Sequence, residues 1–138
     1  MSVCRSVLVV EDDEQILRLM VRLLERAGHR VLSARDLPSA LAHFDGAGGG
    51  IDLALLDVNL DPSGGAAELL PLLELRAPGL EVVLMSGDAL PEALEQTLAA
   101  RGGSFLRKPF APTALLRLLA APGDPMAEGG AGPAGTGR

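Results

Sequence analysis

Three short apolar runs of this chain each end in charged residues. The runs and the residues that follow them are 6–10 (SVLVV) before Glu11, Asp12 and Asp13, 51–56 (IDLALL) before Asp57, and 104–107 (SFLR) before Lys108. Runs rich in Val and Leu that alternate with helical patterns are typical of buried parallel strands. Ligands of an open parallel sheet bind beyond the carboxyl ends of its strands. We therefore expect the carboxylates of Glu11, Asp12 and Asp57 and the ammonium group of Lys108 to meet at one edge of a sheet, while Asp13 could cap the helix that follows.

Such a group of side chains suits the handling of a phosphoryl group. Neighbouring carboxylates repel one another, and a hard divalent cation such as Mg²⁺ relieves the repulsion. A metal, an exposed Asp and a Lys can together neutralise a transferring phosphoryl group. Ser86, which follows the apolar run 81–85, adds a hydroxyl. Each of these residues alone has a simpler explanation, as a helix cap, turn former or solvated charge, so the prediction rests on their joint occurrence.

Composition excludes several classes of protein. The chain has 138 residues, a formal net charge of −6 and a pI of about 4.8, which argues against nucleic-acid binding. Its single cysteine, Cys4, allows no intrachain disulfide and favours a reducing compartment. No apolar run approaches the roughly 18 residues of a membrane span. The sequence thus predicts a soluble cytoplasmic protein without a membrane segment.

Strand and helix patterns alternate along residues 6–121. The expected strands are 6–10, 29–34, 51–56, 81–85 and 104–107, and the expected helices are 14–27, 37–45, 66–76, 91–101 and 112–121. The third helix is ambiguous, because Pro71 would lie inside it or else mark its start; we favour a helix that begins before Pro71. This alternation predicts a doubly wound α/β sheet. Residues 122–138, rich in Gly, Ala and Pro, are expected to be a disordered tail or linker outside the single domain 1–121.

Four stretches in order resemble receiver domains of two-component response regulators, including receivers associated with hybrid histidine kinases. They are VLVVEDDE (7–14), LLDVNL (55–60), LMSGD (84–88) and FLRKPF (105–110). The resemblance implies a (βα)5 flavodoxin-like fold with a five-stranded parallel sheet in the order 2-1-3-4-5. The sequence departs from the common receiver pattern in the stretch after Asp57. Asp61 stands in the usual place of a proline, and Pro62 follows one residue late.

The resemblance also implies a role for each matching residue. Asp57 would be the phosphoacceptor, and Glu11, Asp12, Asp57 and the backbone carbonyl of Asn59 would hold Mg²⁺ or Mn²⁺. Ser86 and Lys108 would contact the phosphoryl oxygens. Ser86 and Phe105 would form the switch. Asn59 and Asp88 would tune the lifetime of the phosphoryl group.

Partners follow from the same resemblance. A histidine kinase or phosphotransfer protein would donate the phosphoryl group, with specificity on the first helix around Gln15, Arg18, Leu19 and Arg22. An output protein, or a second copy in a homodimer, would bind the surface of the last two helices. The two histidines, His29 and His43, match no metal or phosphotransfer pattern, so we expect both to be ordinary surface residues.

Three other interpretations stay open at this point. The chain could be the receiver part of a hybrid histidine kinase, or a pseudo-receiver that binds partners without being phosphorylated. It could also be an aspartyl phosphatase or phosphotransferase, but Asn59 stands where such enzymes often carry a second Asp as general acid. We therefore expect a regulatory domain that promotes its own phosphorylation and dephosphorylation, not an enzyme acting on a separate substrate.

Overall fold

Strands and helices alternate in the computed structural model, which describes residues 4–48, 50–58, 66–100 and 102–119. In this part of the chain the elements are β1 (Ser6–Val10), α1 (Glu14–Arg26), β2 (Arg30–Ala34), α2 (Leu37–Gly46), β3 (Leu53–Asp57), α3 (Ala66–Arg76), β4 (Glu81–Ser86), α4 (Glu92–Ala100), β5 (Ser104–Arg107) and α5 (Pro112–Leu119). The five strands form one parallel sheet in the order β2-β1-β3-β4-β5. This confirms the predicted doubly wound α/β fold.

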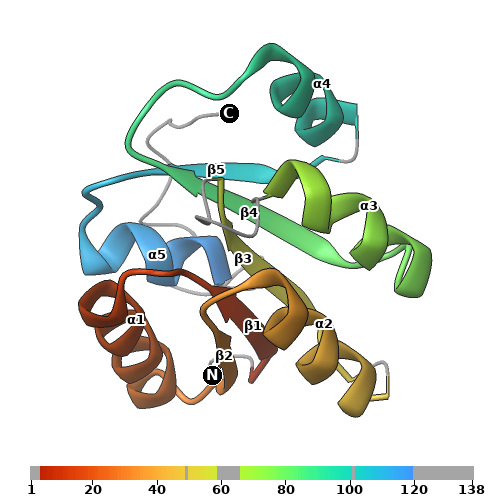
Figure 1. The fold of residues 1–138 in the computed structure, drawn as a ribbon. Coiled ribbons are helices and arrows are strands. Elements are labelled where there is room, and N and C mark those ends of the chain that lie inside the picture. Colours follow the sequence, from red (N-terminus) through yellow and green to blue (C-terminus); the bar gives the residue numbers. More distant parts are fainter. Residues whose placement is uncertain (1–3, 49, 59–65, 101, 120–138) are drawn as a thin grey trace.

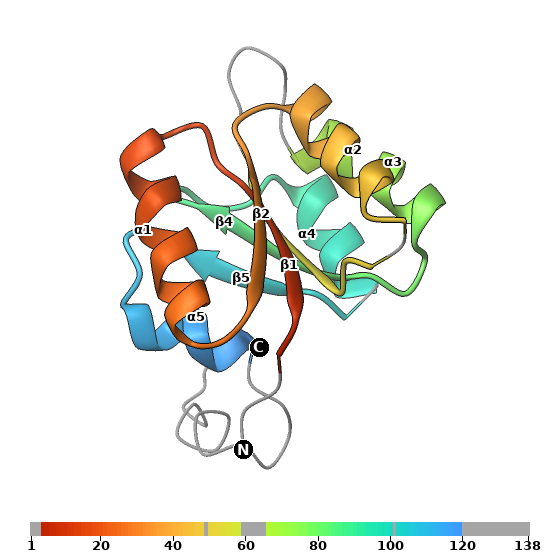
Figure 2. The same cartoon turned by 90° about the horizontal axis from the view of Figure 1, so that it is seen from below.

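The helices cover both faces of the sheet (Figures 1 and 2). Helices α1 and α5 lie on one face, and α2, α3 and α4 lie on the other. Strands β1, β3 and β4, which occupy the middle of the sheet, are buried on both faces and therefore read as continuous apolar runs. Aliphatic side chains dominate both core clusters, which is expected of a chain with no Trp or Tyr and 3 Phe.

Local signals account for the position of α1. The Asp13 side chain caps its start by accepting hydrogen bonds from the backbone N–H groups of Gln15 and Ile16. Leu17, Met20 and Leu24 recur at helical spacing and are buried against the sheet. The chain then leaves the helix through Gly28, whose φ of +97° favours glycine.

Most predicted boundaries agree with the structure to within two residues. β3 begins at Leu53 instead of residue 51 and includes Asp57, and α3 begins before Pro71 and continues past it, as expected. The predicted loop 57–65 lies largely outside the described residues, and so does the predicted tail 122–138, so the limits of the domain stay a prediction. No helix in the described ranges has the length and apolarity needed to cross a membrane.

The expectation that His29 is an ordinary surface residue is wrong. His29 is half-buried between α1 and β2, and its Nδ1 accepts a hydrogen bond of 3.1 Å from the backbone N–H of Arg5. Burial, and then the charge of Arg5, lower the pKa of His29. The sequence pattern missed this contact because the two residues lie 24 positions apart and meet only when β1 pairs with β2. His43 is exposed, as expected.

Candidate functional site

Strand register brings the predicted site residues to one edge of the sheet. Val10, the last residue of β1, pairs with Leu56 of β3, so Glu11 follows beside Asp57. Asp57 pairs with Met85 of β4, and the next residue, Ser86, pairs with Arg107 of β5. Lys108 therefore leaves β5 at the same edge as the three carboxylates, which confirms that these groups meet.

Three carboxylates form a cluster at this edge. Glu11, Asp12 and Asp57 each offer one oxygen atom, and these atoms lie within 4.8 Å of one another. Glu11 and Asp57 are buried, and Asp12 is half-buried, so the cluster opens to solvent on the Asp12 side. Oxygen ligands of this kind are those that Mg²⁺ and other hard divalent cations prefer.

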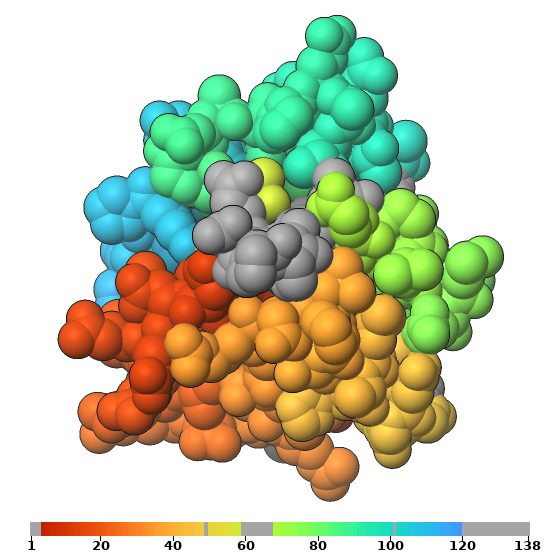
Figure 3. All heavy atoms as spheres, in the orientation of Figure 1, coloured from red at the N-terminus to blue at the C-terminus, as the bar shows by residue number. Residues whose placement is uncertain are grey.

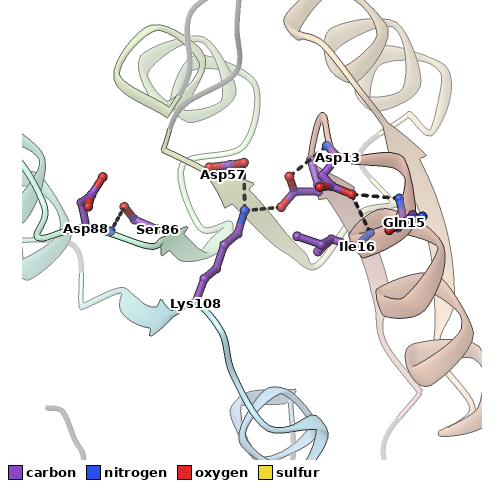
Figure 4. Close-up of polar contacts among 8 residues, drawn as sticks. Asp13, Gln15, Ile16, Asp57, Ser86, Asp88 and Lys108 are labelled. Carbon is purple, nitrogen blue, oxygen red and sulfur yellow. Dashed lines mark hydrogen bonds and ion pairs between the residues drawn. The ribbon is translucent and has the colours of Figure 1, made fainter.

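Lys108 binds two of these carboxylates (Figure 4). Its Nζ lies 2.5 Å from Glu11 Oε1 and 3.1 Å from Asp57 Oδ2. Its backbone N–H donates a hydrogen bond of 2.9 Å to the carbonyl oxygen of Ser86, which ties the end of β4 to the start of the segment after β5. The ammonium group thus offsets part of the negative charge of the cluster.

Burial and charge shift the pKa values of Glu11 and Lys108. Burial, with a smaller contribution from the neighbouring Asp57, raises the pKa of Glu11 to about 7, against the opposing effect of the hydrogen bonds from Lys108 and from the backbone N–H of Asp13. Burial alone would lower the pKa of Lys108, but its hydrogen bonds with Glu11 and Asp57 raise it. Lys108 is therefore a permanent cation at neutral pH, placed between two acidic side chains.

Ser86 and Asp88 lie on the other side of Lys108 from the start of α1 (Figure 4). Ser86 is buried, and its Oγ accepts a hydrogen bond of 3.0 Å from the backbone N–H of Asp88. Because that bond uses an acceptor lone pair, the hydroxyl proton stays available for donation. The side chain of Asp88 is exposed.

Phe105 lies on the face of β5 that is turned toward α4. Its ring is half-buried and packs against the core cluster that includes Leu84 of β4 and Leu94 and Leu98 of α4. A ring without a hydroxyl needs no polar partner in this position. The structure thus places Phe105 between the sheet and α4.

Asn59 and Arg35 also follow strands that end at this edge. Asn59, predicted to supply a carbonyl ligand, lies outside the described residues. Arg35 follows β2, and Glu11 N–H donates a hydrogen bond of 3.0 Å to the carbonyl oxygen of Ala34, so Arg35 follows directly beside the acidic segment. The sequence interpretation omitted Arg35, although it follows an apolar strand in the same manner as Asp57 and Lys108.

Comparison with known proteins agrees with this geometry. The family model described as "Response regulator receiver domain" matches residues 7–120. The sensory/regulatory protein RpfC of Xanthomonas campestris pv. campestris is 34% identical over 119 residues, which cover 82% of this chain and 16% of that protein. The CAI-1 autoinducer sensor kinase/phosphatase CqsS of Vibrio cholerae is 30% identical over 119 residues, covering 85% of this chain and 17% of that protein. The chain thus spans about a sixth of the length of these relatives.

Solved structures show the same fold. A CheY-like response regulator receiver domain protein from Methanospirillum hungatei JF-1 superposes with a TM-score of 0.72 at 30% identity, over 83% of this chain and 89% of that one. The chemotaxis protein CheY4 of Vibrio cholerae superposes with a TM-score of 0.74 at 28% identity, over 85% and 97% of the two chains.

Proposed function

Because the chain belongs to the response regulator receiver domain family, we propose that Asp57 accepts a phosphoryl group from a histidine kinase or phosphotransfer protein. The observation that carries this proposal is the meeting of Glu11, Asp12 and Asp57 with the ammonium group of Lys108. Receivers are regulatory domains, and self-catalysed phosphorylation and dephosphorylation at Asp57 is the activity we propose here.

In this proposal each side chain has a part in the transfer. An Asp57 carboxylate oxygen attacks phosphorus in line with the bond to the donor nitrogen; the P–N bond breaks and an acyl phosphate forms. Lys108, already 3.1 Å from Asp57 Oδ2, stabilises the negative charge on the transferring oxygens. The Ser86 hydroxyl donates a hydrogen bond to the new phosphoryl group. Water later hydrolyses the acyl phosphate, and Asn59 and Asp88 tune that rate.

The acidic cluster fits the divalent cation that receiver domains generally use. Glu11, Asp12 and Asp57, with the backbone carbonyl of Asn59 as a further ligand, would hold Mg²⁺ or Mn²⁺. The bound cation supplies charge neutralisation for the phosphoryl group. In its absence the charge balance depends on Lys108 alone, which is why we expect phosphorylation to require the metal.

Signal output follows from movement near Ser86 and Phe105. A phosphoryl dianion that draws the Ser86 hydroxyl toward it vacates space beside β4, and the Phe105 ring rotates into that space. This rotation would alter the surface of α4, β5 and α5, where an output protein or a second copy of the chain binds. A Phe105→Ala variant with unchanged phosphorylation and unchanged partner binding would contradict this coupling.

The exposed face of α1 suits the donor protein. Gln15, Arg18, Leu19 and Arg22 are all exposed, and Leu19 keeps 53% of its surface accessible. The histidine kinase or phosphotransfer protein would therefore dock here, beside the phosphoacceptor edge. The alternative that this sequence is the receiver part of a hybrid kinase is compatible with the same docking face.

Intact mass after incubation with acetyl phosphate and Mg²⁺ tests the proposal. We expect a gain of one phosphoryl group that disappears with EDTA and in Asp57→Asn. Asp52→Asn is the matched control, because Asp52 is an exposed carboxylate at the other end of β3 whose role as acceptor for Ser6 N–H an amide oxygen can replace. A mass gain that persists in Asp57→Asn would refute the assignment of the acceptor, and no gain with any donor would favour a pseudo-receiver.

A further inference from the structure

A second polar feature adjoins the acidic cluster and has no part in the mechanism above. A pocket of about 650 Å³ lies between the start of α1, the end of β2 and the start of α2, and it opens to solvent. Asp12 lines it, so the pocket is continuous with the phosphoacceptor edge. The other polar side chains in its wall are Arg35, Ser33, Ser39, His43 and Asp36.

Arg35 is the cation of this pocket. Its side chain is exposed, and within the described part of the chain its guanidinium group forms neither an ion pair nor a hydrogen bond. An exposed guanidinium group presents a planar fork of donors that fits the oxygens of a phosphate or carboxylate. Figure 3 shows the surfaces of α1 and of the β2–α2 segment meeting on the face turned toward the viewer.

The remaining groups of the pocket agree with an oxyanion ligand. The hydroxyl of Ser33 can donate a hydrogen bond to it, and His43 adds a ring N–H. Asp36 is engaged as the cap of α2, where it accepts hydrogen bonds from the backbone N–H of Ser39, at 2.8 Å, and from the Ser39 side chain. These hydrogen bonds, and then the charge of Arg35, lower the pKa of Asp36. Asp12 belongs to the group of carboxylates that suits a divalent cation, and a bound cation would offset its repulsion of an anion.

We propose that this pocket is an oxyanion-binding subsite, centred on Arg35, that captures small dianionic phosphodonors beside Asp57. The proposal rests on the proposed function for its role in transfer, because the captured anion is the phosphoryl compound that Asp57 attacks. Binding of the anion itself is independent of that function. In a chain whose net charge is −6, the exposed positive charge of Arg35 beside an acidic site raises the local concentration of such a donor.

The binding arm of the test uses inorganic phosphate as its probe. Phosphate is titrated against NaCl of equal ionic strength, at pH 8 with Mg²⁺ present, while histidine ring resonances are recorded by NMR. The chain has two histidines: His43 lines the pocket, and His29 lies at the opposite edge of the sheet against Arg5. We expect the His43 signals to shift with phosphate and the His29 signals to stay in place.

Two charge-removing variants supply the controls. Arg35→Gln should weaken phosphate binding about tenfold, the equivalent of one charge-assisted hydrogen bond. Arg30→Gln removes the same charge from the other end of β2, where Arg30 is exposed, and should leave binding unchanged. A His43 signal that ignores phosphate, or one that responds alike in both variants, overturns the proposal.

The kinetic arm measures the rate of phosphorylation by acetyl phosphate at subsaturating donor. Arg35→Gln should react several-fold more slowly than Arg30→Gln, with the same rate of dephosphorylation once the donor is removed. Equal rates in the two variants would overturn the role in transfer. If the parent chain takes no phosphoryl group at all, the proposed function fails, while the phosphate titration still decides whether the subsite exists.

Discussion

At the residue scale, the edge of the sheet that carries Glu11, Asp12, Asp57 and Lys108 is held together by opposing charges. Three carboxylates within 4.8 Å repel one another, and the only cation that contacts them in the described part of the chain is Lys108. The site is thus built for a further positive charge, which costs stability while that charge is absent. Such a cost is common at functional sites, where local rules are broken for the sake of binding.

Asp12→Asn should make this cost measurable. In EDTA the variant should unfold with a free energy about 1 kcal/mol higher than that of the parent chain, because one repelling charge is gone. Mg²⁺ at 100 times its dissociation constant should stabilise the parent by about 2.7 kcal/mol and the variant far less. Urea unfolding with and without Mg²⁺ measures both effects.

Glu25→Gln is the control for that experiment, since Glu25 is an exposed carboxylate near the far end of α1. It should respond to Mg²⁺ like the parent chain. If Mg²⁺ stabilised Asp12→Asn as much as the parent chain, the cation would bind elsewhere.

His29 carries a pH dependence of a different kind. Burial, and then the charge of Arg5, lower the pKa of His29, so folding favours the neutral ring. Its Nδ1 accepts the hydrogen bond from Arg5 N–H only while that nitrogen is unprotonated. A lowered pKa means that the contribution of His29 to stability is complete above the ordinary value of 6.5. It is lost as pH falls from 6.5 through the folded pKa.

NMR titration of the ring signals should therefore place the midpoint of His29 below 6.5. Between pH 7.5 and 5.5, the parent chain should lose more unfolding free energy than His29→Asn, and comparing the two cancels the titration of Glu11. His43→Asn, altered at an exposed position, should keep the pH dependence of the parent. A midpoint for His29 at or above 6.5 would contradict the assigned hydrogen bond.

At the element scale, capping and amphipathic patterns explain most helices, but α3 breaks a rule. Pro71 is the sixth residue of this eleven-residue helix, where it lacks the N–H that would bond the carbonyl one turn earlier. Burial of Leu69, Leu70 and Leu73 holds the helix against the sheet in spite of this loss. Tertiary packing here overrides the local preference.

Pro71→Ala should consequently stabilise the protein, by about 1–3 kcal/mol in urea unfolding, because the exposed position regains a backbone hydrogen bond. Pro112→Ala provides the comparison, since Pro112 is the first residue of α5, where proline is well tolerated. It should bring no such gain. A destabilised Pro71→Ala variant would mean that the proline shapes α3 in a way its hydrogen bonding does not explain.

At the scale of the whole molecule, the close approach of α4 to the sheet depends on Gly103. A Cβ atom at this residue would overlap the Leu98 side chain and lie 3.0 Å from the carbonyl oxygen of Val82. Leu98 is buried, so it has little room to move aside. The packing of α4 on β4 and β5 therefore requires glycine at the position directly before β5.

Gly103→Ala should cost about 1–3 kcal/mol of unfolding free energy, the usual effect of overpacking. Gly79→Ala, where an added Cβ meets nothing within 4 Å, should change stability little. Acetyl phosphate labelling of Gly103→Ala well below its unfolding temperature should still occur, because the acidic edge lies at the other end of the sheet. Equal stability of the two variants would contradict the packing argument.

The sequence by itself determined the order and type of the elements, the fold class and the acidic residues and lysine that meet at one edge of the sheet. It could do so because hydrophobic periods and caps are local, and because parallel strands bring their carboxyl ends together by rule. The sequence left the start of the helix around Pro71 ambiguous, and the structure places that start at Ala66, before the proline.

Only the tertiary structure decided which groups touch. Lys108 forms ion pairs with both Glu11 and Asp57. The backbone N–H of Arg5 donates a hydrogen bond to His29, and Arg35 and Asp12 line the same pocket. These contacts join residues that lie 23 to 97 positions apart in the chain, so no local pattern carries them. They depend on strand register and on side-chain direction, which are set by the packing of the whole sheet against its helices.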